Sequence, residues 1–277
     1  MNDDVARHYA NQGVLTRILA ALQQAGKDID RLTIDDLAPV DEFHSRRRAA
    51  TEELAAMLAP AASDRVIDIG AGLGGPARYL ATRYGCRVSG IDLTQAFVAA
   101  ATDLTRRTGL SDSVDFQLGS ALDLPFARSL FDCAWSQNVG MNIADRARYY
   151  AEAYRVLKPG GRFAIQDVAA GNGEPIDYPV MWAETSQISF LRTPEETRAL
   201  LEAAGFSIQQ WVDNTEAALA ETEAERVRMA ASGDPSRPPL LGIHLIVGAN
   251  FRDRVRNMNR AMADGRMRLI NAVLIRR

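Results

Sequence analysis

The glycine-rich segment Asp68–Gly75, DIGAGLGG, constrains the fold of this chain more than any other stretch. It follows a short apolar run at residues 65–67 and leads into residues 76–85, which have helical spacing with Pro76 in the first turn. Glycine allows the backbone to turn tightly and allows a ligand to approach the main chain. A strand, a glycine-rich turn and a helix in this order predict a ligand site in an α/β fold. A tight turn that binds nothing is the alternative.

Strand and helix patterns alternate along the next hundred or so residues. Strands are predicted at 65–70, 86–92, 114–121, 131–138 and 162–168, and helices at 76–85, 94–109 and 145–157. A KPGG turn at 158–161 is expected to precede the fifth strand. This alternation predicts a parallel sheet with helices on both faces.

The segments on either side of this alternation have a different pattern. Residues 1–60 predict a helical extension or cap, with helices at 6–24 and 46–59 and a loop at 32–45. Residues 61–277 then form one domain, with lid segments at about 169–192 and 213–264. Within this domain we expect a capped helix at 193–205, a strand at 206–212, helices at 215–231 and over most of 241–265, and a final strand at 266–277.

Composition excludes several classes of protein. Of the 277 residues, 47% are apolar, which is enough to bury a full core. The net charge of −3 argues against non-specific electrostatic binding of nucleic acid, and no apolar run is long enough to span a membrane. Two cysteines, Cys86 and Cys133, have no metal-ligand spacing, and the acidic, polar start is unlike a signal peptide. We therefore expect a cytoplasmic protein that binds no nucleic acid and has no membrane span, and a homodimer stays open.

The glycines alone fit two cofactors. Gly70, Gly72 and Gly75 satisfy a dinucleotide pattern, and Gly74 in place of Gly75 gives a second pattern. Asp68 ends the first strand, where a carboxylate would repel a pyrophosphate and attract an ammonium group. S-adenosylmethionine carries an α-ammonium and no phosphate, so Asp68 favours it over a nicotinamide dinucleotide, which remains the alternative.

The chain resembles a known family in several of these motifs. VIDIGAGLGGPARYLA, GIDLT, GSALDLPF and the segment FDCAWSQNVGMNIADRARYYAEAYRVLKPGGRFAIQDV together resemble the class I S-adenosylmethionine-dependent methyltransferases, strongly over residues 65–168. The resemblance implies a Rossmann-like seven-stranded sheet in the order 3-2-1-4-5-7-6, with the last strand antiparallel. It also implies S-adenosylmethionine as the methyl donor, S-adenosylhomocysteine as the product, and no metal.

A second resemblance lies before this core. DEFHSRRRAAT, residues 41–51, is similar to a segment of glycine, sarcosine and dimethylglycine N-methyltransferases and of tocopherol-type methyltransferases. Arg47 stands where that pattern has glycine. This likeness favours the nitrogen of a small amine as acceptor, with O- or C-methylation of a ring or isoprenoid compound close behind. A binding protein with a degenerate site is a third hypothesis.

Site residues follow from the resemblance position by position. It implies that Asp68 holds the ammonium group of the cofactor and that Asp92, after the second strand, holds the ribose. The other implied cofactor residues are Gly70, Gly72, Gly74, Leu93, Ala121, Leu122 and Gln137. Ser120 replaces the acid that the family has beside the adenine.

Few side chains are available for the chemistry itself. Methyl transfer from a sulfonium is an in-line displacement, so the protein mainly has to position the acceptor and exclude water. His44 is the candidate base, or else a loop histidine with a structural hydrogen bond. Candidate substrate-binding residues are Phe43, Asn138, Met141 and Trp182. Met141 and Trp182 could equally be core residues that bury an apolar face.

Overall fold

A computed structural model describes residues 13–231, 241–247 and 250–277. Its centre is a seven-stranded sheet in the order β3-β2-β1-β4-β5-β7-β6. The strands are β1 Arg65–Ile69, β2 Arg87–Asp92, β3 Val114–Leu118, β4 Phe131–Gln137, β5 Leu157–Ala170, β6 Phe206–Asp213 and β7 Met267–Arg276. Neighbouring strands are parallel from β3 to β5, and β7 is antiparallel to both β5 and β6. The predicted strand order and the antiparallel last strand are confirmed.

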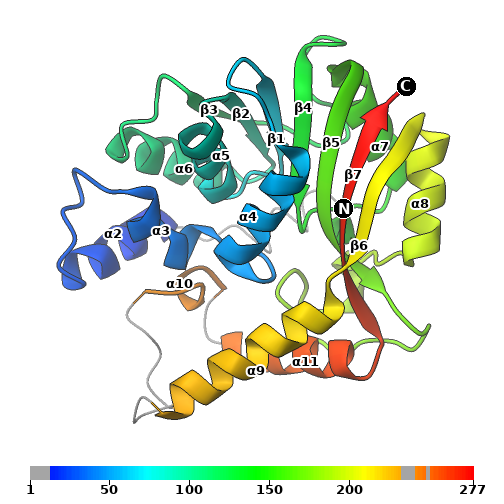
Figure 1. Cartoon of the computed structure of the whole chain (residues 1–277). Helices are drawn as coiled ribbons and strands as arrows, with labels where there is room; N and C mark the ends of the chain where they lie inside the picture. The colour runs from blue at the N-terminus through cyan, green and yellow to red at the C-terminus, as the bar shows by residue number, and fades with distance from the viewer. Residues whose placement is uncertain (1–12, 232–240, 248–249) are drawn as a thin grey trace.

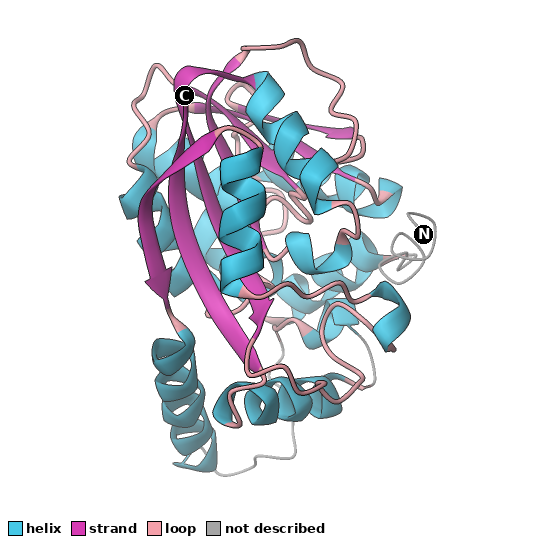
Figure 2. Cartoon of the chain, turned by 90° about the vertical axis from the view of Figure 1, so that its right-hand side faces the viewer, coloured by secondary structure: helices cyan, strands magenta, loops and turns pink. Residues whose placement is uncertain are grey.

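Helices lie on both sides of this sheet (Figures 1 and 2). They are α2 Val14–Gln24, α3 Ile34–Asp41, α4 Arg47–Leu58, α5 Gly75–Tyr84, α6 Gln95–Arg107, α7 Arg146–Val156, α8 Pro194–Ala203, α9 Thr215–Ala231, α10 His244–Val247 and α11 Phe251–Ala263. Short 3-10 turns occur at Gly140–Asn142 and Ser186–Ile188. The expected capping box forms at α8, where Thr193 and Glu196 bond reciprocally to each other's backbone.

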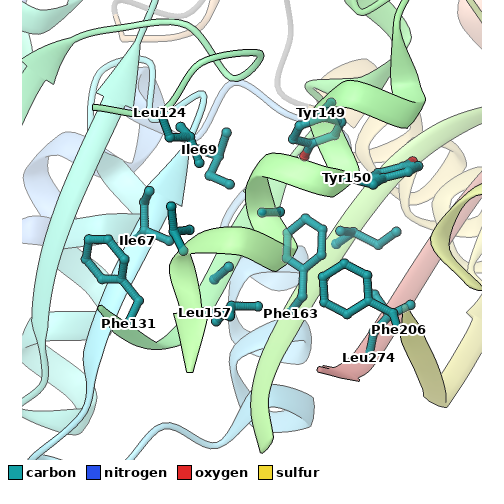
Figure 3. Packing of buried hydrophobic residues seen from close by; sticks show 14 of the residues in the cluster. Ile67, Ile69, Leu124, Phe131, Tyr149, Tyr150, Leu157, Phe163, Phe206 and Leu274 are labelled. Atoms are coloured by element: carbon teal, nitrogen blue, oxygen red, sulfur yellow. The ribbon is translucent and has the colours of Figure 1, made fainter. Parts of the chain in front are cut away.

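Two apolar clusters fill the space between the sheet and its helices. One lies against α7 and α8 and contains Phe131, Tyr149, Phe163 and Phe206 (Figure 3). The other lies against α4 and α5 on the opposite face and surrounds Trp135. Because both faces are covered, the central strands are buried almost throughout, as expected for a parallel sheet.

The remaining helices cover one edge of the sheet. In Figure 1, α9 and α11 lie below the sheet, at the end where β5 finishes and β7 begins, and α10 lies between them and the α2–α3 region. The parallel strands all finish at this carboxyl edge. Ligands of open α/β sheets bind at that edge, so α9, α10 and α11 cover the edge at which a ligand is expected.

Three expectations from the sequence need correction. The loop predicted at 32–45 contains α3, which begins with a capping box between Thr33 and Asp36 and tolerates Pro39 near its end. The fifth strand is longer than predicted: β5 begins at Leu157, and the KPGG residues are part of it. The first described helix, α2, begins at Val14 rather than at residue 6, and residues 6–12 of that prediction lie outside the described residues.

Two other sequence observations have structural counterparts. Cys86 and Cys133 are both buried and free, and burial raises the pKa of Cys86 to about 11 and that of Cys133 to about 12. Neither thiol is therefore a reactive thiolate at neutral pH. None of the helices in the described part of the chain is long and apolar enough to cross a membrane.

Candidate active site

A cavity of about 760 Å³ lies at the carboxyl edge of the sheet. Its walls come from the turns after β1, β2, β3 and β4, from residues 41–49, and from the segments that cover the edge, namely residues 181–184 and helices α9, α10 and α11. This volume lies within the range of sites that enclose a drug-sized ligand. All but one of the site residues named from the sequence line it.

The exception is Gly74, which has a structural task instead. Gly74 precedes α5 with a φ of 80°, in the left-handed region, and a side chain there would collide with the ring of Phe116. Gly72, with a φ of 54°, does line the cavity, and a Cβ on it would approach the ring of Phe43 to 2.8 Å. The glycine pattern therefore combines a backbone turn with a close approach to the cavity.

Asp68 is the most unusual charged group in the cavity wall. It is 2% exposed, and its Oδ2 accepts no hydrogen bond from any residue that the structure describes. Burial, followed by the negative charges of Asp92 and Glu42, raises the pKa of Asp68 to about 8. Because a buried carboxyl group without a partner is costly, this atom marks a place where a donor or a cation belongs.

Asp92 is already held in place by the backbone. Its Oδ2 accepts from the Gly72 amide at 2.9 Å, and its Oδ1 accepts from the Thr94 amide at 2.8 Å. Burial raises the pKa of Asp92, and these backbone hydrogen bonds oppose that effect. Each carboxylate oxygen has a second lone pair, so Asp92 can still accept hydrogen bonds from a ligand.

Next to Asp92, a group of half-buried apolar residues forms one wall. Leu93, Ala121 and Leu122 line the cavity, and Ser120 lies beside them with its hydroxyl accepting from the Leu122 amide at 3.2 Å. We call this region the glycine-loop half of the cavity. It consists of Asp68, Gly70, Gly72, Asp92, Leu93, Ala121 and Leu122.

The opposite region, the methionine-lined half, is apolar. It consists of Met141, Met181, Trp182, Ala218, Met258 and Met262. All six residues also belong to, or pack against, one hydrophobic cluster that joins the strand ends to α9 and α11. Trp182 is 1% exposed and donates its indole N–H to Ser189 Oγ at 2.9 Å. Methionine adapts to irregular surfaces, so this half is suited to an apolar ligand.

His44 lies in the wall near the N-terminal segment, in a dense polar network. Its Nε2 is 2.9 Å from Oε2 of Glu42, which is fully buried. The Thr51 hydroxyl donates to the same carboxylate oxygen at 2.6 Å, and Arg48 Nε is 2.7 Å from the other oxygen. Burial opposes ionisation of Glu42, but His44, Arg48 and Thr51 outweigh it and lower the pKa of Glu42.

The strand ends place two predicted polar residues side by side. The Gln137 side chain accepts from Trp135 Nε1 at 3.1 Å, and its Oε1 lies 3.3 Å from the Thr51 hydroxyl oxygen, whose proton is donated to Glu42. Asn138 follows with a φ of 53° and donates from its side chain to Ser45 Oγ at 3.2 Å. These bonds tie the N-terminal segment to the end of β4 beside the cavity.

Arg46 and Arg47 both adopt positive φ values, 65° and 46°. Such values favour glycine, which explains why the resembling segments have glycine where this chain has Arg47. Arg46 uses the turn to reach across the cavity: its Nη2 lies 2.7 Å from Oε1 of Glu221 on α9, and its Nη1 pairs with Glu53. The basic run at 46–48 is therefore partly structural.

Several residues in or directly behind the cavity wall have no signal in the sequence. Glu42 lies behind His44, and a buried acid beside a histidine has no spacing signature. Met258 and Met262 lie one turn apart on α11, a spacing that indicates one helix face but not its partner. Arg254 of the same helix bonds to the Val180 carbonyl and pairs with Glu184. Among the described residues, no group of three His, Cys, Asp or Glu side chains could hold a metal ion.

Comparison with known proteins agrees with this geometry. Residues 67–165 match the family described as Methyltransferase domain. Methyltransferase GfsG of Streptomyces halstedii is 33% identical over 184 residues, which cover 65% of this chain and 66% of that protein. Sarcosine/dimethylglycine N-methyltransferase of Halorhodospira halochloris is 29% identical over 76% of this chain and 75% of that protein. The chain thus spans about two thirds to three quarters of the length of these curated relatives.

The fold has close counterparts among solved structures. Geranyl diphosphate C-methyltransferase from Streptomyces coelicolor A3(2) superposes with a TM-score of 0.71 over 100% of this chain and 98% of that one, at 22% identity. At this identity the likeness concerns the fold alone. The matched domain, the curated methyltransferase relatives and the strand order agree, and the chain belongs to the class I S-adenosylmethionine-dependent methyltransferases of the small-molecule type.

Proposed function

We propose that this protein transfers a methyl group from S-adenosylmethionine to a largely apolar small molecule that is bulkier than a glycine-type amine. The observation that carries the proposal is the division of the cavity into a glycine-loop half and a methionine-lined half. The first half suits a cofactor with a cationic tail and a ribose. The second half offers the acceptor an apolar surface.

The glycine-loop half fits S-adenosylmethionine through its unsatisfied acid. The buried Oδ2 of Asp68 needs a donor, and an α-ammonium group supplies both donors and positive charge. In this assignment Asp92 accepts from the ribose hydroxyls, while Leu93, Ala121 and Leu122 contact the adenine. Gly70 and Gly72 leave room for the methionine portion, and Gln137 lies at the strand end beside it.

The apolar lining of the methionine-lined half favours a large, apolar acceptor. A glycine-sized amine occupies roughly the volume of a few water molecules, each about 30 Å³ in the liquid. Such an acceptor would leave apolar walls around Met141, Trp182 and Met258 in contact with water, which is unfavourable. A zwitterion would also need charged partners, and the charged residues that line this side, Arg254 and Glu184, already pair with each other. A ring, isoprenoid or polyketide-like acceptor uses the available surface instead.

The separate roles of the cofactor and of the protein in the reaction follow from this arrangement. S-adenosylmethionine supplies a methyl group already activated on a sulfonium, and the protein aligns the acceptor with it. Phe43, Met141 and Trp182 orient the acceptor through packing, and Asn138 contributes an amide group near the strand end. Exclusion of water by the cover strengthens the electrostatic contacts inside.

Closure of the site belongs to the proposal as well. Residues 1–60 act as a cap, and the segments 169–192 and 213–264 act as lids over residues 61–277. Contacts between the cap and the rest support this assignment. Arg46 pairs with Glu221, and Asn214 donates to Glu53 at 3.1 Å. Asn142, just after β4, holds the cover by donating to the carbonyls of Trp182 and Ile188 at 3.0 Å each.

Two measurements test the function. Calorimetry should detect binding of S-adenosylmethionine and S-adenosylhomocysteine in the micromolar range, whereas NADH should neither bind nor protect against thermal unfolding. Methyl-labelled cofactor should then label hydrophobic ring and isoprenoid alcohols in a panel that also contains glycine, sarcosine and dimethylglycine. Label confined to those three amines would contradict the acceptor class, and failure to bind either sulfur cofactor at millimolar concentration would contradict the activity.

A further inference from the structure

We propose that Asn259 is a specificity-determining residue whose side-chain amide hydrogen-bonds a second oxygen on the acceptor, a hydroxyl or carbonyl remote from the atom that is methylated. The inference rests on the proposed function and deepens it. An acceptor that is apolar over most of its surface then carries one polar group that faces α11. The observation behind the inference is an amide in the apolar wall of the cavity that bonds to no other described residue.

Asn259 belongs to the face of α11 that lines the cavity. The cavity residues of this helix recur at helical spacing, and they are Arg254, Val255, Met258, Asn259 and Met262. Val255 and Met262 lie about one turn from Asn259 on either side, and all three line the wall. The half-buried amide therefore interrupts an apolar surface. It lies with the methionine-lined half rather than with the glycine-loop half, to which the methyl donor is assigned.

The other polar side chains of the cover already have partners within the protein. Residues 181–262 contribute several such side chains to the cavity wall, and their bonds are those of Trp182 to Ser189, Glu184 to Arg254, Glu221 to Arg46 and Thr222 to the Ala218 carbonyl. The Asn259 side chain, in contrast, forms no hydrogen bond with any residue that the structure describes. It is therefore the polar group of the cover that is open to a ligand.

Asn257, on the same helix, shows what a structural asparagine does here. Its Nδ2 donates to the Pro179 carbonyl at 3.0 Å, and its side chain is buried outside the cavity. Asn259 has no such bond, and asparagine forms helices less readily than leucine or methionine does. Asn259 therefore stabilises neither its helix nor the packing around it, which is typical of a residue that serves a ligand.

Binding of an acceptor changes what the Asn259 amide requires. Water can satisfy the amide while the cavity is open to solvent, but an acceptor that packs against Met258 and Met262 displaces that water. An amide left without a partner in an apolar site is unfavourable. A hydroxyl or carbonyl oxygen on the acceptor restores the hydrogen bond, because the amide nitrogen donates and the amide oxygen accepts. The site therefore discriminates against an acceptor with only hydrocarbon at that position.

A stability measurement separates this role from a structural one and needs no acceptor. Asn259→Leu replaces the amide with an apolar side chain of similar size. The denaturant midpoint of the free full-length protein should stay the same or rise, because no group in the protein loses a partner. The affinity for S-adenosylhomocysteine, measured by calorimetry, should also stay the same. A lower midpoint would overturn the proposal, since it would show that the amide contributes to the fold.

Matched acceptors test the specificity directly. The labelled panel should include pairs that share a skeleton and differ by one distant oxygen, such as farnesol with 12-hydroxyfarnesol and 4-phenylphenol with 4,4′-biphenol. In the pairs that accept label, kcat/KM per hydroxyl should be about tenfold higher for the compound with the second oxygen, as one hydrogen bond predicts. Asn259→Leu should bring this ratio to about one. Asn250→Leu, an exposed change just before α11, is the matched control and should leave the ratio unchanged.

The outcomes distinguish this inference from the proposed function. Equal kcat/KM values within the labelled pairs, or a preference for the second oxygen that persists in Asn259→Leu, would overturn the role of Asn259 and leave methyl transfer intact. Absence of cofactor binding, or label on none of the hydrophobic alcohols, would instead count against the proposed function.

Discussion

The two halves of the cavity are built from different kinds of sequence. The glycine-loop half comes from residues 68–122, where the wall residues lie at or just after the ends of the strands of the sheet. The methionine-lined half comes from residues 141–262, which reach the cavity from a strand end, an irregular segment and two helices. The first half depends mostly on backbone conformation and two acids, whereas the second depends on side-chain packing.

This difference separates the two binding tasks physically. A backbone turn and a fixed carboxylate tolerate little variation, because small displacements break hydrogen bonds. An apolar wall of methionines can be resized with modest losses, because such walls repack. We therefore expect changes in one half to affect the cofactor and changes in the other half to affect the acceptor.

The largest effect should come from Asp68→Asn. This change removes the charge that faces the cofactor ammonium while keeping the shape, so the affinity for S-adenosylhomocysteine should fall about a hundredfold, or about 2.7 kcal/mol. Calorimetry at pH 8 measures it. Asp112→Asn, at an exposed loop position, is the matched control. An affinity within threefold of the unmodified protein would mean that Asp68 does not face the ligand.

A second effect of up to tenfold per pH unit should appear in the cofactor affinity. Without ligand, Asp68 holds its proton up to a pKa of about 8, because of burial and the charges of Asp92 and Glu42. Binding the ammonium requires the ionised form, so the affinity should fall as the pH drops from 8 to 6.

The Asp68 proton also affects the stability of the fold, which should rise as the pH drops, whereas the cofactor affinity falls. The folded chain keeps the Asp68 proton up to about pH 8, whereas the unfolded chain releases it near the ordinary value of 3.8. The contribution of Asp68 to stability is therefore present at low pH and is lost as the pH rises towards 8.

Calorimetry in buffers of different ionisation enthalpy should detect proton release on cofactor binding at pH 7. Asp68→Asn should abolish that release, and its persistence would assign the proton to another group.

The next effect, a loss of about tenfold in kcat/KM for the acceptor, is expected from a substitution in the methionine-lined half. Met258→Ala removes packing surface from the methionine-lined half, so kcat/KM for a hydrophobic acceptor should fall by about a factor of ten, in line with the loss of a few methylene contacts. The dissociation constant of S-adenosylhomocysteine should change less than twofold. Met57→Ala, on α4 outside the cavity, should leave both constants unchanged. Equal losses for cofactor and acceptor would remove the distinction between the halves.

The smallest effect concerns a residue in neither half. Ala59 ends α4 with a φ of 46° and is exposed. Glycine is favoured at such a position, so Ala59→Gly should raise the free energy of unfolding by about 0.5–1 kcal/mol. Denaturant titration measures this change. The dissociation constant of S-adenosylhomocysteine and kcat/KM for the acceptor should stay the same. This variant therefore serves as the control for a change in stability that leaves the site unaltered.

The two halves differ in how far the sequence alone predicts them, for a physical reason. Glycines and acids at strand ends have fixed spacing, so the motif is enough to place Asp68, Gly72 and Asp92 at the carboxyl edge. Helix α3 escapes the same reasoning because Pro39 suggests a loop, although the Thr33–Asp36 capping box is present. Met258 and Met262 cannot be assigned in this way, because helical periodicity identifies a buried face without identifying what covers it.

Glu42 illustrates the same limit within a short segment. Its neighbour His44 is identified by resemblance, but the approach of Arg48 and Thr51 depends on where α4 begins, after a turn with positive φ values. Backbone turns of that kind are rare outside glycine and are not signalled by arginine. Local spacing therefore predicts the candidate base and not the acid behind it.

Under the glycine turn, the guanidinium of Arg78 is fully buried and lies 2.7 Å from Asp41 Oδ2, while also donating to the Leu73 carbonyl and the Thr105 hydroxyl. Asp41 belongs to α3, before the matched domain, and Arg78 belongs to α5 within it. Asp41→Asn would leave that cation enclosed without its counter-charge, a loss of about 3–5 kcal/mol, and a fragment that begins at residue 61 would lose both the counter-charge and the helix that covers Arg78. The N-terminal sixty residues and the Rossmann-like core must therefore be expressed, engineered and exchanged between relatives as one piece.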